Sequence, residues 1–169
     1  MARTNNRLTN QGVWIGAGPG TEDAVSLFVP GQLGMVYIAL GKVYQFVRFV
    51  STTATIAAGT PVVWQDEDDF VVSSAIADST RNRPAGIALG TQTAAYYGWI
   101  QVGGPHSAVL QASGLDFASG DTLVYGTTDG RCIRVAAGTA STYIPVGIAT
   151  AASTSTAVAA IVDVPHNGW

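Results

Sequence analysis

The sequence predicts an all-β fold, a small β-barrel or sandwich built from two repeated β units, with an extended N-terminal arm. Three observations predict it. Residues that favour strands, chiefly Val, Thr, Ile and Tyr, are plentiful, whereas the helix-favouring Leu, Glu, Lys and Gln are scarce. Turn residues separate short apolar runs, and Gly occurs 20 times. The second half of the sequence also aligns with the first at one constant shift, which places Pro84 on Pro145 and is here called the repeat shift.

Residues 1–12 are polar, rich in Asn and Arg, and carry no strand pattern, so we expect an extended arm there. Such an arm can lie across a neighbouring subunit, which makes Arg3 and Arg7 candidate protein-interface residues. Two charges are too few for a phosphate-binding surface. The arm also lacks the apolar run of a signal peptide, which predicts an uncleaved product made in the cytoplasm.

Residues 13–50 are expected to form an N-terminal β segment. Strands are predicted at Val13–Ile15 and Val25–Val29, with a longer one from Val36 to Val50. In the longer run, apolar and aromatic side chains occupy both alternating sets, so we expect a strand that is covered on both faces. Trp14 is a further candidate interface residue, because aromatic side chains concentrate at protein interfaces.

Residues 51–169 are expected to form a β-barrel or sandwich domain with an internal repeat, whose copies span residues 58–102 and 119–164. The repeat shift aligns the same Pro-x-Gly-Ile-Ala run at Pro84–Ala88 and at Pro145–Ala149. Each copy is typical of a small sheet with one face to bury. Two such sheets that face each other can close a barrel or a sandwich.

Short apolar runs with turn residues between them predict the strands of this domain. Turns are predicted at Gly103-Gly104-Pro105 and at Asp129-Gly130. The chain closes on Trp169, an aromatic residue that needs a partner and is therefore also a candidate interface residue. The predicted strands are Thr60–Trp64, Phe70–Ser73, Ala85–Leu89, Trp99–Val102, Ser107–Gln111, Thr122–Tyr125, Ile133–Ala136, Val146–Ala149 and Ala157–Val164.

Charged residues make up 11% of the chain, whereas an average soluble domain carries about 25%. The exterior must therefore consist largely of small and uncharged polar residues, which suits a protein that packs against neighbours. The formal net charge of −3 argues against nucleic acid as a partner, because binding to phosphates requires clustered Lys and Arg.

Neither a membrane span nor a covalent cross-link is predicted. The uncharged stretches Pro84–Leu115 and Val135–Val162 are interrupted by Gly, Thr, Ser or Pro, and neither holds the roughly 20 consecutive apolar residues of a membrane helix. Cys132 is the only cysteine, so no intrachain disulfide and no cysteine-based zinc site can form. In its predicted strand, we expect a half-buried structural thiol.

Candidate catalytic groups are sparse, and we predict no enzymatic activity. His106 and His166 are the only histidines, and the Gly, Pro and Asn residues beside them predict turns that position no nucleophile. The acidic run Asp66–Asp69 lacks the pattern of a calcium-binding loop and predicts a solvated turn. Gly16–Gly20 lacks the Lys and Ser/Thr of a phosphate-binding loop. We expect no catalytic residue, metal ligand, cofactor or small-molecule substrate.

A family resemblance rests on two runs, Asn82–Gly90 (Asn-Arg-Pro-Ala-Gly-Ile-Ala-Leu-Gly) and Tyr97–Gly104 (Tyr-Gly-Trp-Ile-Gln-Val-Gly-Gly). Both runs resemble the small capsid decoration, or cement, proteins that stabilise the heads of tailed bacteriophages. Ser119–Val124 and Pro145–Ala149 look like a continuation of the pattern, so that the likeness spans roughly residues 50–164. The segments before it match no family pattern.

The resemblance implies a structural virion protein on the outer surface of the capsid. Its partners would be the major capsid protein and further copies of itself, often as a homotrimer, and its role would be to hold the shell together against the pressure of packaged DNA. The sequence leaves two other functions open. One is a different virion component, such as a tail, baseplate or head fibre. The other is a carbohydrate-binding β module, which would use the exposed faces of Trp and Tyr side chains.

Overall fold

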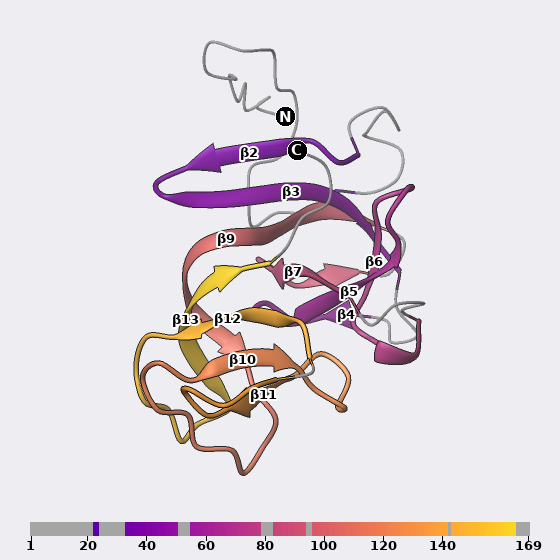
Figure 1. Ribbon diagram of the computed structural model, residues 1–169. Coiled ribbons are helices and arrows are strands. Elements are labelled where there is room, and N and C mark those ends of the chain that lie inside the picture. The colour runs from indigo at the N-terminus through magenta and orange to yellow at the C-terminus, as the bar shows by residue number, and fades with distance from the viewer. Residues whose placement is uncertain are drawn as a thin grey trace.

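The computed structural model describes residues 22–23, 33–50, 55–78, 83–93, 96–141 and 143–164. Over these ranges the protein is nearly all β, and the one helical element among them is a short 3-10 turn, η3 (Ile76–Asp78). Figure 1 shows two β bodies joined by one long curved strand, β9 (Tyr97–Leu110). The predicted fold class is therefore confirmed. The expected arm, residues 1–12, lies outside the described residues.

The first body, here called the first unit, is a closed barrel of five strands. Four strands join β9 in this ring: β3 (Lys42–Phe49), β5 (Pro61–Asp66), β6 (Val71–Ser73) and β7 (Pro84–Ala88). The first half of β9 pairs with β3 on one side and with β7 on the other. The ring closes where β3 pairs in parallel with β6.

The second unit uses the second half of β9 as its first strand. The added strands are β10 (Thr122–Tyr125), β11 (Cys132–Val135), β12 (Pro145–Ala149) and β13 (Ala157–Asp163). From β9 the sheet continues in the order β13, β12, β10, β11. A parallel bridge between Gln111, at the end of β9, and Cys132 connects β11 back to β9, as the parallel β3–β6 pair does in the first unit.

One strand pair of each unit follows the repeat shift, β5 with β7 in the first and β10 with β12 in the second. β7 and β12 are the two Pro-x-Gly-Ile-Ala runs, and each begins at the proline and ends at the last alanine of its run. Pro61 lies opposite Ile87 in the first unit, and Thr122 lies opposite Ile148 in the second. Both pairs also have a register irregularity at the same position. The repeated sequence therefore encodes a repeated strand pair.

The repeat begins earlier in the structure than in the sequence. β3 lies within the range 13–50 that the sequence assigns to a separate segment, yet it is a strand of the first barrel. At the repeat shift, its residues correspond to 103–110 in β9, and no position in the two stretches is identical. The first strands of the two units therefore differ in sequence, and the repeat could not be extended to them from the sequence alone.

The single long strand expected from Val36 to Val50 is wrong. The chain forms a hairpin instead, β2 (Val36–Ala39) followed by β3, and turns at Leu40 and Gly41, whose φ angles are 51° and 72°. Leu gives no turn signal, which is why the sequence reads as continuous. The expectation of two covered faces holds for β3, since its alternating side chains join two different apolar clusters.

The turn predicted at Gly103-Gly104-Pro105 is also wrong, because β9 runs through these residues without a reversal. The strands predicted at Trp99–Val102 and Ser107–Gln111 are consequently parts of one strand, and His106 lies in it rather than in a turn. The glycines instead allow the backbone of β9 to lie close to the β2–β3 hairpin. A Cβ on Gly104 would lie 2.1 Å from the carbonyl oxygen of Gly41, in the β2–β3 turn.

The other predicted strands of the domain are present, with ends that differ by one or two residues. The predicted turn at Asp129-Gly130 lies between β10 and β11, and Gly130 has a φ of 64°. Three two-residue strands were too short to predict: β1 (Glu22–Asp23), β4 (Thr55–Ile56) and β8 (Gln92–Thr93). The strands expected at Val13–Ile15 and Val25–Val29 lie outside the described residues.

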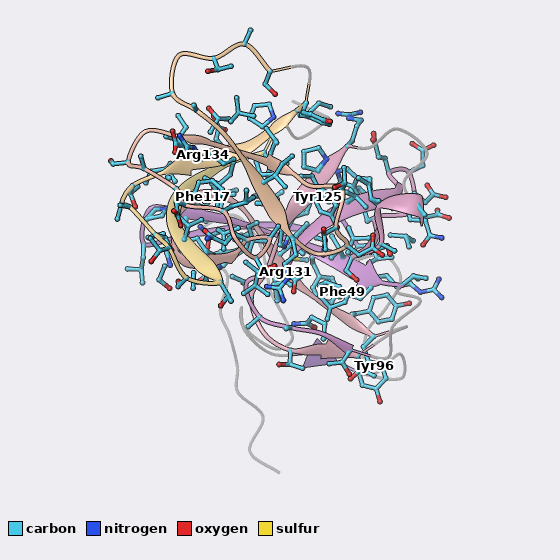
Figure 2. The ribbon with its side chains drawn as sticks, turned by 90° about the horizontal axis from the view of Figure 1, so that it is seen from below. Phe49, Tyr96, Phe117, Tyr125, Arg131 and Arg134 are labelled. Carbon is cyan, nitrogen blue, oxygen red and sulfur yellow. The ribbon has the colours of Figure 1, made fainter. Side chains whose placement is uncertain are left out.

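Two main cores hold the units together. The first fills the barrel and contains Phe49, and the second lies in the second unit and contains Phe117 and Tyr125, all three labelled in Figure 2. Val63 and Ile87 point out of the first barrel and belong to the second core, so the second unit packs directly on the outside of the first. The two repeats are therefore joined by apolar contact as well as by β9.

Candidate protein-interaction surface

Arg3, Arg7, Trp14 and Trp169, the interface residues proposed from the sequence, all lie outside the described residues. A candidate surface must therefore come from what the described part exposes. Three groups of apolar side chains reach solvent there: one at the turn of the β2–β3 hairpin, one on the sheet of the second unit, and one at Tyr143 and Ile144, just before β12.

The first group, here called the hairpin tip, consists of Ile38 and Leu40. Ile38 is 70% exposed and Leu40 is 96% exposed, the largest exposed fractions among the large apolar side chains described. Leu40 also has a φ of 51°, in the left-handed region. For a residue with a Cβ this conformation costs about 1–2 kcal/mol, and turns of this kind favour Asn, Asp and Gly.

The hairpin that carries the tip is firmly anchored. β3 pairs with β9 along its length, and the turn at Gly41 packs against Gly104. The ring of Tyr37, from β2, lies 6.1 Å from that of Tyr44 and 6.1 Å from that of Trp99, centroid to centroid. Burial, and then the neighbouring Tyr37, raise the pKa of Tyr44 above its ordinary value of 10.0. The tip is thus an apolar projection on a rigid aromatic base.

The second group, here called the isoleucine stripe, consists of Pro105, Ile148 and Ile161. Ile148 on β12 lies opposite Ile161 on β13, and Ile161 lies opposite Pro105 on β9. Neighbouring strands lie about 4.8 Å apart, so the three residues form one row across the outer face of the sheet. Ile148 is 53% exposed, Ile161 is 44% exposed, and Pro105 is also exposed.

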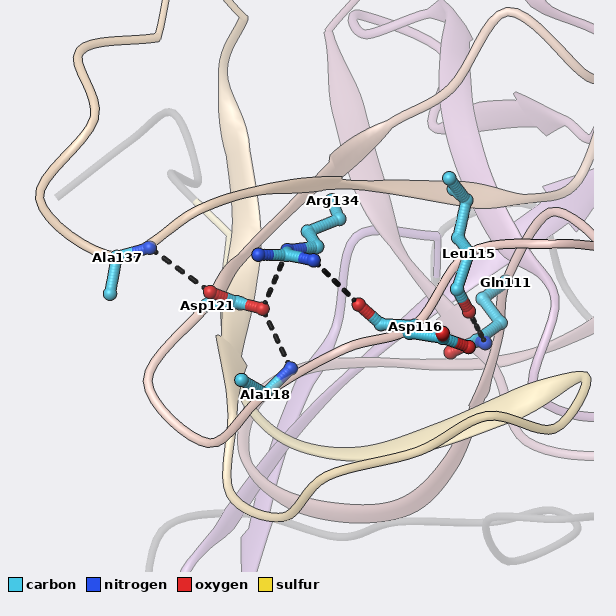
Figure 3. A network of polar contacts seen from close by, with 7 residues as sticks. All are labelled: Gln111, Leu115, Asp116, Ala118, Asp121, Arg134 and Ala137. Atoms are coloured by element: carbon cyan, nitrogen blue, oxygen red, sulfur yellow. Dashed lines mark hydrogen bonds and ion pairs between the residues drawn. The ribbon is translucent and has the colours of Figure 1, made fainter.

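A polar network supports the second unit beside this stripe (Figure 3). The Asp121 carboxylate, which is 4% exposed, accepts hydrogen bonds from the backbone N–H groups of Ala118 (2.7 Å) and Ala137 (3.0 Å). It also pairs with Arg134 at 2.8 Å. The Ala118 hydrogen bond, then that of Ala137 and the charge of Arg134, lower the pKa of Asp121 against the opposing effect of burial.

The sequence did not indicate this network. Asp121 corresponds to Thr60 in the first unit, and two of its three partners are backbone amides of alanine. Such partners leave no pattern in the side chains. Asp121 lies immediately before β10, and the first residue of β10 lies opposite Ile148. The network therefore holds the start of the strand that pairs with β12 beside the stripe.

Three of the titratable groups considered for catalysis, Asp66, Glu67 and His106, have structural partners, and His166 lies outside the described residues. Asp66 accepts hydrogen bonds from the N–H groups of Asp68 and Asp69 at 3.0 and 3.2 Å, which organises the acidic turn, and Glu67 pairs with Arg83 at 2.9 Å. Burial and the nearby charge of Lys42 lower the pKa of His106. Its Nδ1 accepts the N–H of Ala108 at 3.2 Å. Within the described ranges, no three His, Cys, Asp or Glu side chains gather as a metal site.

The Cys132 thiol is fully buried, more deeply than the half-buried position expected from the sequence, and burial raises its pKa. Because thiol reagents attack the thiolate, we expect no labelling of the native protein by a maleimide and complete labelling in denaturant. Mass spectrometry of both samples measures this directly. Rapid labelling of the folded protein would contradict the packing around Cys132.

The described tryptophans are not available to a ligand. Trp64 is 8% exposed and Trp99 is 1% exposed, and both belong to apolar clusters. Both side chains therefore pack in the core, which removes them from any sugar-binding face. Tyr96 and Tyr97 are partly exposed (Figure 2 labels Tyr96), and Tyr97 packs beside Phe46.

In the described part of the chain, no helix is long and apolar enough to cross a membrane. No family model matches the sequence, and no curated protein matches it.

Proposed function

We propose that this chain is a structural, non-enzymatic virion protein that decorates the outer surface of a tailed-phage capsid. It stabilises the shell by binding the major capsid protein and further copies of itself. The observation that carries the proposal is the hairpin tip. Leu40 adopts an unfavourable backbone conformation and leaves a large apolar side chain 96% exposed. Its value is expected in a contact with another protein.

The composition and the likeness of the Pro-x-Gly-Ile-Ala runs to decoration proteins support the same proposal. A surface with few charges is weakly hydrated and costs little to cover, and only 11% of the residues are charged. A rigid β scaffold with an apolar projection transmits force well and needs no moving part. Several copies that each bind modestly hold a shell more tightly than any single contact, because linked attachments act together.

The proposal is tested on phage heads made with and without the protein. Heads that lack it are expected to assemble but to burst at a lower temperature, as measured by release of DNA into the medium. Adding back the purified protein should restore the original bursting temperature. Heads that resist heating equally well in both states would contradict the stabilising role. Gold labelling of intact particles locates the protein on the head, or on the tail, baseplate or head fibre if its role lies there.

Replacing Leu40 by Asn tests the contact with the capsid separately from the stability of the fold. Asn tolerates the left-handed conformation, so the free energy of unfolding should rise by about 1 kcal/mol, as measured by chemical denaturation. Binding to heads that lack the protein should weaken about tenfold or more, because the apolar contact is lost.

The matched control for Leu40→Asn is Thr139→Asn, which changes an exposed residue in the loop between β11 and β12, outside both the hairpin tip and the isoleucine stripe. It should alter neither stability nor binding to heads. A Leu40→Asn protein that binds heads as tightly as the wild type would exclude the hairpin tip as the docking element.

A further inference from the structure

The isoleucine stripe contains a residue whose counterpart in the first unit is covered. At the repeat shift Ile148 corresponds to Ile87, in the same Pro-x-Gly-Ile-Ala run and the same pairing register. Ile87 is 0% exposed because the second unit packs on it, whereas Ile148 is 53% exposed. The chain therefore already shows this position buried by a neighbouring unit of its own kind.

The covered face gives the chemistry of such a contact. Its centre is apolar, since Val63 and Ile87 join the core of the second unit. At its margin, the N–H of Gly130 and the hydroxyl of Tyr125 donate hydrogen bonds to the carbonyl oxygen of Ser74. The N–H of Ile76 donates to the Asp129 carboxylate at 2.9 Å. An apolar centre with a polar margin is the usual composition of a protein interface.

The surroundings of the stripe have the same composition. The loop from Thr150 to Thr156, between β12 and β13, contains only Ala, Ser and Thr, and most of these residues are exposed. Asp163, two residues beyond Ile161, is the one charged residue of β13. Two copies that meet here bring few like charges together, so electrostatic repulsion does not oppose their contact.

We propose that a second copy of this chain packs on the isoleucine stripe and covers Ile148 and Ile161 in solution. At Ile148, this contact between copies repeats the burial that its counterpart Ile87 has within one chain. Self-association is part of the proposed function, so the inference rests on that function. The inference adds the face through which two copies meet.

The test measures mass by size-exclusion chromatography with light scattering, at protein concentrations up to on the order of 100 μM. The wild type is expected at a multiple of 17.4 kDa, and the double variant Ile148→Thr with Ile161→Thr at 17.4 kDa. Its dissociation constant should rise about tenfold or more. The matched control is Ile38→Thr with Leu40→Thr, which also replaces two exposed aliphatic residues and should keep the mass of the wild type.

A wild type that is monomeric throughout this range, or a stripe variant as associated as the wild type, would overturn the inference. Thermal unfolding shows that each variant is folded, and the single variant Ile148→Thr replaces the double variant if the latter is not. Binding to phage heads is measured separately on the same proteins. Stripe-dependent association without head binding refutes the proposed function alone, whereas head binding by a protein that never self-associates refutes this inference and leaves the proposed binding to the capsid intact.

Discussion

The substitution Asp121→Ala is expected to lower the free energy of unfolding by about 3 kcal/mol, because it leaves two backbone N–H groups without their acceptor. For a protein of this size the midpoint of thermal unfolding should fall by roughly 5–10 °C, measured by calorimetry. Arg134→Ala should cost only about 1 kcal/mol. Its side chain is 39% exposed, so solvent screens the ion pair and the amide hydrogen bonds carry most of the effect.

The Asp121 network also predicts how stability depends on pH. The folded state lowers the pKa of Asp121 below its ordinary value of 3.8, so the carboxylate stabilises the fold fully above that pH. The stabilisation is lost as the pH falls through the lower, folded pKa. The stability advantage of the wild type over Asp121→Asn should therefore shrink below about pH 4.

Asp116→Asn is the matched control for both measurements. It changes an exposed aspartate close in sequence whose backbone carbonyl, not its carboxylate, accepts from Arg134. It should leave the unfolding midpoint unchanged. A loss for Asp116→Asn as large as that for Asp121→Ala would show that general surface charge, rather than the buried network, sets the stability.

The substitution Gly104→Ala is expected to destabilise the protein by about 3 kcal/mol or more, as measured by chemical denaturation. Gly104 has a φ of 87°, and a Cβ there would lie 2.1 Å from the carbonyl oxygen of Gly41 and 2.9 Å from the Cα of Lys42. Both are backbone atoms, so the β2–β3 hairpin must move away from β9. The residue thus suffers a steric clash in addition to backbone strain.

Gly138→Ala separates these two causes. Gly138 has a similar φ of 76°, but no atom lies within 4 Å of the position of its Cβ. This variant should lose only about 1 kcal/mol, the cost of the backbone conformation. Equal losses for the two variants would mean that close packing at the centre of β9 contributes nothing.

The pattern of residue types predicted most of the strands, because these strands and their turns are determined by residues close together in the sequence. The repeated Pro-x-Gly-Ile-Ala run located β7 and β12, and the turn at Asp129-Gly130 has the residues that such a turn requires. Two errors share one origin. Leu40 occupies a turn that its side chain disfavours, and Gly104 occupies a strand although its neighbours have turn composition. In both cases contacts between distant segments outweigh local preference.

The candidate surfaces were harder to predict than the fold. An isoleucine has the same local pattern at position 87 as at position 148, and only the packing of the second unit decides that one is buried and the other exposed. The partners of Asp121 are backbone amides that any sequence possesses. Burial and exposure of this kind are properties of the assembled fold and leave no trace in the spacing of residue types.

The strand β9 has a mechanical consequence. Its 14 residues serve as the last strand of one unit and the first strand of the other. A load that pulls the two units apart is therefore carried by covalent bonds along a single polypeptide, and it can separate the units only by shearing the hydrogen bonds that hold β9 in one of them.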